Sequence, residues 1–376
     1  MSKKPRIATF VGTRPEIIKL SATIKALDEF FDHILIHTGQ HYNHELDRIF
    51  FEDLNIRLPD HYLEANRLNP ASCIADIIQK SDALLRQLAP AAILIYGDTN
   101  SALCAYTAKR QRIPIFHMEA GNRCFDPRVP EEVNRRIVDH LSDVNMTISE
   151  QARDNLLREG LRSEFTFKIG SSMPEVLQAA SPKIETSQVL KSLGLAQNGY
   201  YLMSIHREEN VSRDQYMEVL LDFLDTNALD APVVFSAHPR FRQVYGDRSN
   251  KNTVMCEPFG FSDYVHLQTH AKCVISDSGS LMEESALLGF PAVTIRDSHE
   301  RPEAMESASV TVSSWDADHI KRSIGIAVAR SIHMASRPDS EGHSVPDYLC
   351  GDTVSIKVLN IISSYIHQID SKVWFK

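Results

Sequence analysis

The chain has 376 residues, of which 43% are hydrophobic and 24% charged, a balance typical of a globular protein with two domains. Its formal net charge of −9 argues against a nucleic-acid partner, and no apolar run is long enough to predict insertion into a membrane. The short apolar stretch before Thr13 predicts a first strand rather than a signal peptide. The scattered cysteines, without a CxxC pair, predict reduced thiols and a cytoplasmic protein.

Short apolar segments alternate with amphipathic segments through the first half of the chain. The expected strands are 7–11, 33–37, 92–97, 113–118 and 144–148. The expected helices are 15–29, 71–88, 99–110, 131–141 and 149–159. This repeated order of strand and helix predicts a parallel sheet with helices on both faces.

A second series of the same kind begins near residue 200. Its expected strands are 200–206, 232–238, 272–277 and 291–295, and its expected helices are 212–227, 262–270 and 279–288. Between the two series lies a polar segment, 177–199, broken by Pro and Gly, near whose start we expect the domain boundary. We therefore predict an α/β protein with two doubly wound domains, 1–175 and 176–351. The last helix, within 352–376, is expected to pack back on the first domain.

Ligands of doubly wound sheets bind at the carboxyl ends of the strands, and polar clusters follow most of the expected strands. Helix capping explains the Ser, Thr and Asp in these clusters, but not the repeated Arg, His and Glu. In the first domain, Asp98, Glu119 and Glu131 are candidates for proton transfer. Crowded carboxylates raise one another's pKa, which suits a base that takes a proton from carbon. Glu131 could instead cap the helix that starts near Pro130.

In the second domain, Ser278, Gly279 and Ser280 follow a strand and open a helix. The first N–H groups of a helix have no internal partner and lie at its positive end, so this segment predicts a phosphate site. Glu284 lies one turn further along the helix, where it could accept hydrogen bonds from ribose hydroxyls. The alternative for Glu284 is an ordinary solvated helix residue.

Cationic and imidazole side chains also follow strand ends. Arg14 and Arg301 suit phosphate because the guanidinium group binds two oxygens at once. His206 and His238 could donate to phosphate as well, although a lone histidine such as His238 is more often a core or loop residue.

Four other kinds of site are disfavoured by the motifs. The histidines at 37, 41 and 44 have the spacing of a metal cluster, but no Cys ligand and no HExxH motif accompany them. We therefore expect no metal. The chain has no GxGxxG, no GxxxxGK[ST] and no GxSxG motif, which argues against NAD, P-loop chemistry and serine hydrolysis.

Eight segments between residue 12 and about residue 306 carry a family resemblance when they are taken in order. They are GTRPEIIKLS, TGQHY, GDTNS, HMEAGNR, RVPEEVNRRIVDH, HREEN, SDSGSLMEESALLGFP and ERPEAME. Together they resemble the non-hydrolysing UDP-N-acetylglucosamine 2-epimerase family. The resemblance implies a GT-B-like fold, with two Rossmann-like domains around a cleft, usually as a homodimer, and no cofactor.

The resemblance also implies an activity, the inversion of C2 in a UDP-linked 2-acetamido sugar. A base removes the C2 proton while UDP leaves, and UDP adds back to the bound glycal after a proton arrives on the other face. The matching catalytic residues are Asp98, Glu119, Glu131 and His206. The matching residues around UDP and the sugar are Arg14, Lys19, Ser278, Gly279, Ser280, Glu284 and Arg301.

The segments HMEAGNRCFD, RVPEEVNRRIVDH and ERPEAME look closest to one branch of this family. That branch converts UDP-2-acetamido-2,6-dideoxy-L-talose to UDP-N-acetyl-L-fucosamine for surface polysaccharide such as capsule or O-antigen. Because a 6-deoxy sugar lacks one hydroxyl, its pocket should be more apolar there, and Phe125 is a candidate wall. The alternatives are epimerisation of UDP-N-acetylglucosamine to UDP-N-acetylmannosamine, a GT-B glycosyltransferase, a hydrolysing epimerase and a sugar-nucleotide sensor without catalysis.

Overall fold

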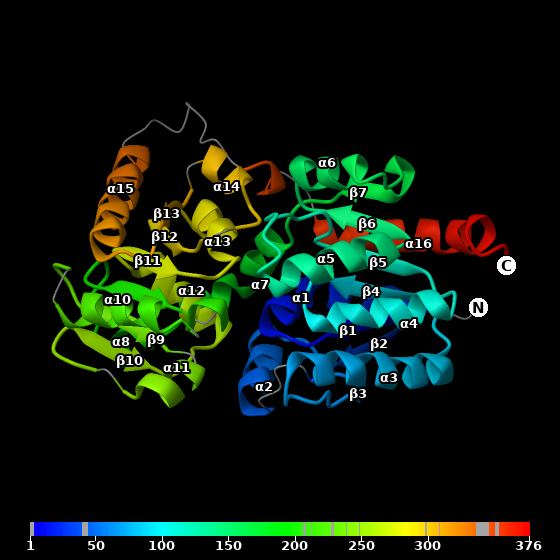
Figure 1. Cartoon of the computed structure of the whole chain (residues 1–376), viewed down its shortest axis with the longest axis horizontal. Helices are drawn as coiled ribbons and strands as arrows, with labels where there is room; N and C mark the ends of the chain where they lie inside the picture. Colours follow the sequence, from blue (N-terminus) through cyan, green and yellow to red (C-terminus); the bar gives the residue numbers. More distant parts are fainter. Residues whose placement is uncertain are drawn as a thin grey trace. The chain divides into compact units, whose positions relative to one another are not determined.

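The chain is described here by a computed structural model in which two compact units are distinguished. Unit 1 comprises Met1–Ala179 with Asp347–Lys376, and unit 2 comprises Ala180–Pro346. The described residues are 4–39, 44–205, 208–211, 213–226, 229–237, 239–247, 249–297, 299–307, 309–335, 346–349 and 353–376. Each unit is a parallel sheet covered by helices (Figure 1).

The sheet of unit 1 has seven parallel strands in the order β3-β2-β1-β4-β5-β6-β7. The strands are β1 (Arg6–Val11), β2 (Asp32–His37), β3 (His61–Tyr62), β4 (Ala92–Tyr96), β5 (Ile115–Met118), β6 (Val144–Thr147) and β7 (Thr166–Lys168). Ile7 of β1 lies opposite both His33 of β2 and Ala92 of β4. The chain therefore reverses its direction of travel across the sheet between β1 and β4, which is the topological switch point of a Rossmann-like fold.

The helices of unit 1 lie on both faces of this sheet. They are α1 (Arg14–Phe30), α2 (His44–Asp53), α3 (Pro70–Leu88), α4 (Cys104–Arg110), α5 (Pro130–Leu141), α6 (Glu150–Arg158) and α16 (Val354–Lys372), with short turns η1 (Asn100–Leu103), η2 (Ser163–Phe165) and η4 (Asp347–Leu349). The helix α1 packs against α16, and α4 packs against both α3 and α5. Figure 1 draws α3, α4 and α5 in front of the sheet and α16 behind it.

The α1 helix shows why these segments fold as they do. Ile17, Leu20, Ile24 and Leu27 recur at helical spacing, and all four are fully buried. This stripe is the face that an amphipathic helix turns toward a core, and Pro15 in the first turn costs no hydrogen bond there. The same spacing places the buried residues of α16 on one side, so the two helices share one apolar layer.

Unit 2 repeats the strand order of unit 1 with six parallel strands, β10-β9-β8-β11-β12-β13. The strands are β8 (Tyr201–Ser204), β9 (Val233–Ser236), β10 (Thr253–Cys256), β11 (Cys273–Ser276), β12 (Ala292–Ile295) and β13 (Thr311–Ser313). The helices are α8 (Val189–Ser192), α9 (Glu208–Val211), α10 (Asp214–Asp225), α11 (Pro239–Tyr245), α12 (Phe261–His270), α13 (Leu281–Leu288), α14 (Glu303–Glu306) and α15 (Ala317–Ala335). Its switch point lies between β8 and β11.

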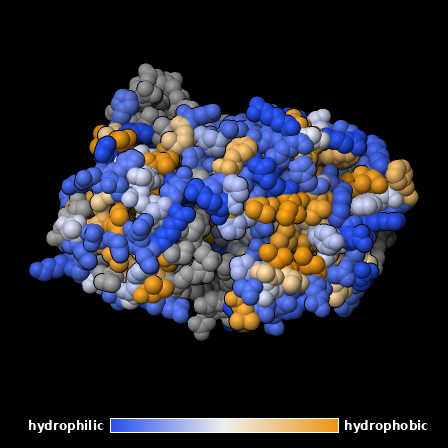
Figure 2. All heavy atoms as spheres, in the orientation of Figure 1, coloured by the Kyte–Doolittle hydropathy of each residue, from blue (hydrophilic) through white to orange (hydrophobic). Residues whose placement is uncertain are grey.

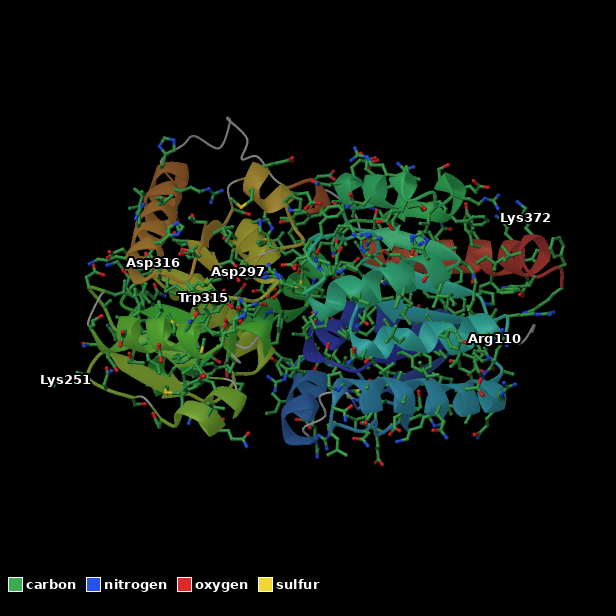
Figure 3. All side chains as sticks on the ribbon, in the orientation of Figure 1. Arg110, Lys251, Asp297, Trp315, Asp316 and Lys372 are labelled. Carbon is green, nitrogen blue, oxygen red and sulfur yellow. The ribbon has the colours of Figure 1, made fainter. Side chains whose placement is uncertain are left out.

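The loops after β12 and β13 contact α10 through a hydrogen bond and an aromatic stack. Trp315 stacks on Tyr216 with ring centroids 4.7 Å apart, and the Tyr216 hydroxyl donates to Asp297 at 2.6 Å. Both Trp315 and Asp297 are labelled on this unit in Figure 3. These contacts hold the outer strands of the sheet against the helix that follows β8.

The prediction of two doubly wound parallel sheets is confirmed, and the polar segment 177–199, near whose start we expect the domain boundary, is partly helical. The helix α7 (Met173–Glu185) runs into that segment, contains Pro182, and is followed by α8. Proline removes one helical hydrogen bond, yet Val176, Leu177 and Ala180 bury an apolar face along this helix and stabilise it. In the part of the chain that the structure describes, no helix is long and apolar enough to cross a bilayer.

Candidate active site

The loops that follow β1, β2 and β4 touch one another at the switch point of unit 1. A Cβ atom on Gly12 would lie 2.0 Å from Ser101 Oγ and 2.1 Å from Thr38 Oγ1. These two hydroxyls share a hydrogen bond of 2.7 Å. Glycine is therefore required at position 12 for the three loops to approach this closely.

Glu16 joins the first and third of these loops through its carboxylate. Its Oε2 accepts hydrogen bonds from the backbone N–H groups of Gly12 at 2.5 Å and Thr13 at 3.0 Å. Its Oε1 accepts one from the Thr99 hydroxyl at 2.5 Å. Burial and, to a lesser degree, the nearby charge of Asp98 raise the pKa of Glu16 to about 7 against the effect of these hydrogen bonds. The carboxylate thus occupies the N-terminus of α1, where this kind of fold often binds an anion.

Lys19 and Glu119 form a buried ion pair beside this loop. Lys19 Nζ lies 3.0 Å from Glu119 Oε2, and the two side chains are 6% and 13% exposed. The same ammonium group lies 5.7 Å from the centre of the Tyr96 ring. Glu119 has a backbone φ of 63°, an uncommon conformation for a residue with a side chain. Such strain persists where the surroundings fix it, as they do at functional sites.

Asp98 is held by α5. Arg135 donates to Asp98 Oδ2 from Nε at 2.8 Å and from Nη2 at 2.7 Å. Asn134 donates to the backbone carbonyl of Asp98 at 3.1 Å. Both the side chain and the backbone of Asp98 are thereby fixed relative to α5.

Glu131 lies in the first turn of α5, where it is half-buried, and its Oε2 atom is fully buried. The next residue, Glu132, accepts a hydrogen bond from the backbone of Cys124 at 3.0 Å and pairs with Arg135 at 3.2 Å and with Arg136 at 2.9 Å. Burial opposes the charge on Glu132, but these partners outweigh it and lower its pKa.

A second buried ion cluster contacts the loops after β4 and β5. His117 Nε2 lies 2.8 Å from the carbonyl of Gly97, and its Nδ1 lies 3.1 Å from Asp139. Asp139 also pairs with Arg123 at 2.7 Å. Burial disfavours a charge on His117, but the Asp139 carboxylate outweighs it and raises the pKa of His117 above its usual value.

Sequence reasoning did not assign functions to Arg135, Glu132, Asp139 or Glu16. One available signal was the segment RVPEEVNRRIVDH, which repeats charged residues three and four apart on a single helix. The other was the Thr13-to-Glu16 spacing of a capping box. Neither signal could name the partners, because those come from other loops.

In unit 2, the segment Ser278-Gly279-Ser280 connects β11 to α13. The hydroxyls of Ser278 and Ser280 lie 3.0 Å apart, and all three residues are half-buried. Asp277, immediately before them, is fully buried and accepts a hydrogen bond from Asn210 at 2.9 Å. The loop is therefore anchored at its start, while its two hydroxyls lie side by side.

Glu284 and Arg301 are both buried in unit 2. Glu284 is 6% exposed and accepts a hydrogen bond from Gln268 at 2.6 Å, so the interpretation of a solvated helix residue is wrong. Arg301 is 1% exposed, and its Nη2 lies 3.0 Å from Glu283. The α13 helix thus carries two adjacent buried carboxylates that are held by different partners.

The remaining predicted residues divide into described and undescribed ones. Arg14 is half-buried, with its guanidinium carbon 5.4 Å from the centre of the Phe50 ring. His206 and His238 lie outside the described residues. Among the residues that are described, no three His, Cys, Asp or Glu side chains are arranged to hold a metal ion. His37 is buried, which lowers its pKa to about 4, and His41 lies outside the described residues.

The predicted residues therefore fall into two groups. In unit 1, the carboxyl ends of β4 and β5 bring Asp98 and Glu119 to neighbouring positions, together with Lys19. In unit 2, Ser278, Gly279, Ser280 and Glu284 follow β11, and Arg301 pairs with the same helix. Paired carboxylates and cations suit proton transfer in the first group, and hydroxyls with an arginine suit a phosphorylated ligand in the second.

Proteins of known sequence are similar to this chain along most of their length. A UDP-N-acetylglucosamine 2-epimerase from Methanocaldococcus jannaschii is 33% identical over 315 residues, which cover 80% of this chain and 86% of the relative. A UDP-2,3-diacetamido-2,3-dideoxy-D-glucuronate 2-epimerase from Pseudomonas aeruginosa is 32% identical over 333 residues, which cover 87% of this chain and 93% of the relative.

Solved structures of the same family are also similar to this chain. The structure of UDP-N-acetylglucosamine 2-epimerase from Rickettsia bellii is 42% identical, with a TM-score of 0.89, covering 99% of this chain and 100% of that one. The Methanocaldococcus jannaschii UDP-GlcNAc 2-epimerase, solved in complex with UDP-GlcNAc and UDP, is 28% identical, with a TM-score of 0.86, covering 96% of this chain and 99% of that one. The family model described as UDP-N-acetylglucosamine 2-epimerase matches residues 25–362. The chain therefore belongs to the UDP-N-acetylglucosamine 2-epimerase family and is an isomerase.

Proposed function

We propose that this protein inverts C2 of a UDP-linked 2-acetamido sugar by eliminating UDP and adding it back. The observation that carries the proposal is the pair of carboxylates, Asp98 and Glu119, at the ends of the adjacent strands β4 and β5. Inversion requires one group to remove a proton and another to return it on the opposite face of the same carbon. Two carboxylates, each placed by its own cation, Arg135 or Lys19, meet that requirement.

In the proposed reaction, every bond that breaks is formed again, and the proton removed from C2 is replaced by another. A carboxylate takes the C2 proton, the electrons of the C–H bond form the C1=C2 double bond, and the C1–O bond breaks as UDP leaves. A proton then arrives at C2 from the other face, and the UDP oxygen adds back to C1. Glu131 and His206 are the further candidates for these proton transfers. Lys19 and Arg14 on α1 supply positive charge for the departing diphosphate.

We further propose that unit 2 holds UDP. The hydroxyls of Ser278 and Ser280, with Gly279 between them, would donate to the diphosphate, with Arg301 and His238 as cationic partners. Glu284, placed by Gln268, would accept hydrogen bonds from the ribose. Support comes from the Methanocaldococcus jannaschii relative, whose structure was solved with UDP-GlcNAc and UDP.

Turnover in deuterated water tests this proposal. The epimerase should place solvent deuterium at C2 of the recovered UDP-sugar, as measured by NMR or mass spectrometry. Asp98→Asn should lower that exchange by about a hundredfold or more while UDP still binds in calorimetry. Transfer of sugar to an acceptor without C2 exchange would show a glycosyltransferase, and release of free sugar with UDP would show a hydrolysing epimerase. Binding without any turnover would show a sensor.

The proposed sugar is UDP-2-acetamido-2,6-dideoxy-L-talose, converted to UDP-N-acetyl-L-fucosamine for surface polysaccharide. The segment HMEAGNRCFD supports it, together with Phe125, which is 70% exposed and whose ring centre lies 5.6 Å from the guanidinium carbon of Arg136. An apolar ring next to a sugar suits a methyl group better than a hydroxymethyl group. The second candidate is UDP-N-acetylglucosamine, which the names of several relatives carry.

Competition between the two sugars decides this choice. The 6-deoxy proposal expects a higher kcat/KM for the deoxytalose compound, and it expects Phe125→Ala to reduce that preference. Faster turnover of UDP-N-acetylglucosamine by the unaltered protein would overturn the choice of sugar while leaving the epimerase proposal intact.

We also propose that the protein is a homodimer through the outer face of α5. This helix buries its polar side, including Glu132, Asn134 and Arg135, while Val133 and Ile137 are 49% and 44% exposed. Figure 2 shows apolar side chains gathered on unit 1 where α4 and α5 lie. A second copy of the same surface would remove this apolar area from water.

Light scattering after gel filtration measures the molar mass and so the oligomeric state of the protein. Val133→Glu should convert a dimer to a monomer because it places a charge in the proposed interface. Ile326→Glu is the matched control, since Ile326 is exposed to a similar degree on α15 of unit 2. A monomeric unaltered protein would contradict the proposal.

A further inference from the structure

Glu16 bonds to two loops of the candidate site without belonging to either predicted group of residues. It is 2% exposed and lies at the start of α1, directly under the switch point between β1 and β4. Ligands of this fold bind outside that point, so the geometry of the two flanking loops decides where reacting groups lie. One loop leads into the helix that carries Arg14 and Lys19, and the other carries Asp98.

The carboxylate of Glu16 is the link between these loops. Its Oε2 accepts hydrogen bonds from the two N–H groups of the loop after β1. Its Oε1 accepts one from the hydroxyl of Thr99, the residue that follows Asp98. The Thr99 hydroxyl in turn accepts a hydrogen bond from the backbone of Ser101 at 3.2 Å. A chain of hydrogen bonds therefore runs from the end of β1 through Glu16 to the turn that holds Asp98.

We propose that Glu16 is a positioning residue for the reaction, which fixes Asp98 relative to Lys19 and Arg14 through the hydroxyl of Thr99. The inference rests on the proposed epimerase function, because it assigns Asp98 to proton transfer. A shift of about 1 Å in such a group is enough to cost a large factor in rate. Arg135 and Asn134 hold Asp98 from the side of α5, and Glu16 holds the same turn from the side of α1.

The charge of Glu16 acts on the same site. Among the described residues, two titratable groups interact electrostatically with Glu16. The charge of Asp98 raises the pKa of Glu16, and the pKa of Cys104 is raised well above its usual value by burial and then by Glu16. Because Glu16 exchanges its proton near neutral pH, the potential at Asp98 changes in the range in which enzymes work. The rate should therefore carry a pH dependence that disappears when Glu16 cannot ionise.

Thr99→Val tests the link, because it removes one hydroxyl without changing the size of the side chain. We expect kcat and the rate of deuterium exchange at C2 to fall about tenfold or more, with KM changed by less than about threefold. Thr99→Ser restores the hydroxyl and should restore most of the rate. Thr107→Val is the matched control, since Thr107 also uses a buried hydroxyl, to Ser81 and Cys104, on the same stretch of chain.

Two further measurements separate the role of the Glu16 charge from the role of its hydrogen bond to Thr99. Glu16→Gln removes the charge, while its amide oxygen can still accept from the two N–H groups and its NH2 group can donate to the Thr99 hydroxyl oxygen. It should therefore remain folded and active while the pH profile of kcat loses its inflection near neutrality. Backbone hydrogen exchange at residues 97–103 should rise in Thr99→Val whether or not the protein is active. Thr99→Val with unchanged kcat and unchanged exchange would overturn the inference. An unaltered protein that fails to exchange C2 protons on any UDP-sugar would overturn the proposed function, and the backbone exchange would then decide the link by itself.

Discussion

Gly12 shows how little space separates the loops of the candidate active site. A methyl group at this position would meet two hydroxyls at about half the normal contact distance, so Gly12→Ala must push the loops after β1, β2 and β4 apart. We expect it to lower the free energy of unfolding by about 1–3 kcal/mol, as overpacked cores do, and to lower kcat as well. Urea unfolding and steady-state kinetics measure the two effects.

The control for that substitution is Gly325→Ala. Gly325 lies on α15 with no atom within 4 Å of its added Cβ, so alanine should stabilise the helix by about 0.5–1 kcal/mol. Equal effects of the two substitutions would show that backbone freedom, and not the close approach of the loops, dominates at position 12.

Glu16 should also make the stability of the protein depend on pH. Its pKa rises from 4.5 to about 7 on folding, so the folded protein keeps a proton that the unfolded chain releases. The stabilisation is complete below the lower value and is lost as the pH rises through the higher one. Relative to Glu16→Gln, the unaltered protein should lose on the order of 2 kcal/mol between about pH 5 and about pH 8. A constant difference across this range, measured by urea unfolding, would contradict the raised pKa.

At the scale of single residues, the sequence was most informative where function requires an unusual residue at a strand end. Asp98, Glu119 and Ser278 lie after buried strands, as expected from the alternation of strands and helices. Gln268 and Glu16 were missed because each acts through a partner on another element. The hydrogen bond from Thr99 joins residues 83 positions apart, and no local pattern encodes it.

At the scale of elements, α5 departs from the usual amphipathic helix. Its buried side holds Glu132, Arg135 and Asp139, while two β-branched apolar residues face outward. Hydrophobic periodicity alone would turn the helix the other way. The ion pairs and hydrogen bonds from the loops after β4 and β5 satisfy the buried charges and so fix this orientation.

Asp139→Asn tests how much those charges contribute. Removing one partner leaves the buried Arg123 with fewer acceptors, so we expect a loss of about 3–5 kcal/mol in the free energy of unfolding. The pKa of His117 should fall, because burial then acts without the Asp139 carboxylate. Urea unfolding and an NMR titration of His117 measure both. The control is Asp154→Asn on the exposed side of α6, expected within about 0.5 kcal/mol, and an equal loss there would contradict the argument.

The strands that the sequence did not predict are β3, β7, β10 and β13, which are the edge strands of the two sheets. Interior strands such as β4 are buried on both sides and read as continuous apolar runs. Edge strands are short and partly polar, since one side pairs with no further strand. The central strands could therefore be inferred from the sequence, and the edge strands could not.

At the scale of the whole molecule, unit 1 is built from two distant parts of the chain. The helix α16 buries Val358, Ile362 and Ile369 within this unit and packs against α1. The turn before it is held by a hydrogen bond of 2.7 Å between the Ser171 N–H and the Tyr348 carbonyl. Unit 1 is therefore incomplete without residues that follow unit 2 in the sequence.

A fusion protein tests this interdependence. Residues 1–179 alone should show a broad, weakly cooperative thermal transition, because the apolar face of α1 lacks its cover. Joining 347–376 to them through a flexible Gly-Ser linker should restore a sharp transition by calorimetry, since the Ser171–Tyr348 contact brings the joined ends close. Identical transitions for the two proteins would show that α16 adds no stability.

The split of unit 1 also sets an order of events during biosynthesis. A ribosome that has finished residue 179 must still synthesise the 167 residues from Ala180 to Pro346 before α16 emerges. At typical elongation rates this takes about 10 to 30 s, far longer than a helix needs to dock. Unit 2 can fold as one continuous stretch of chain. Unit 1, although its first part is made earlier, cannot complete its fold until α16 is made, and the apolar stripe of α1 stays exposed until then. The nascent chain should therefore depend on chaperones through its first part, even though that part leaves the ribosome first.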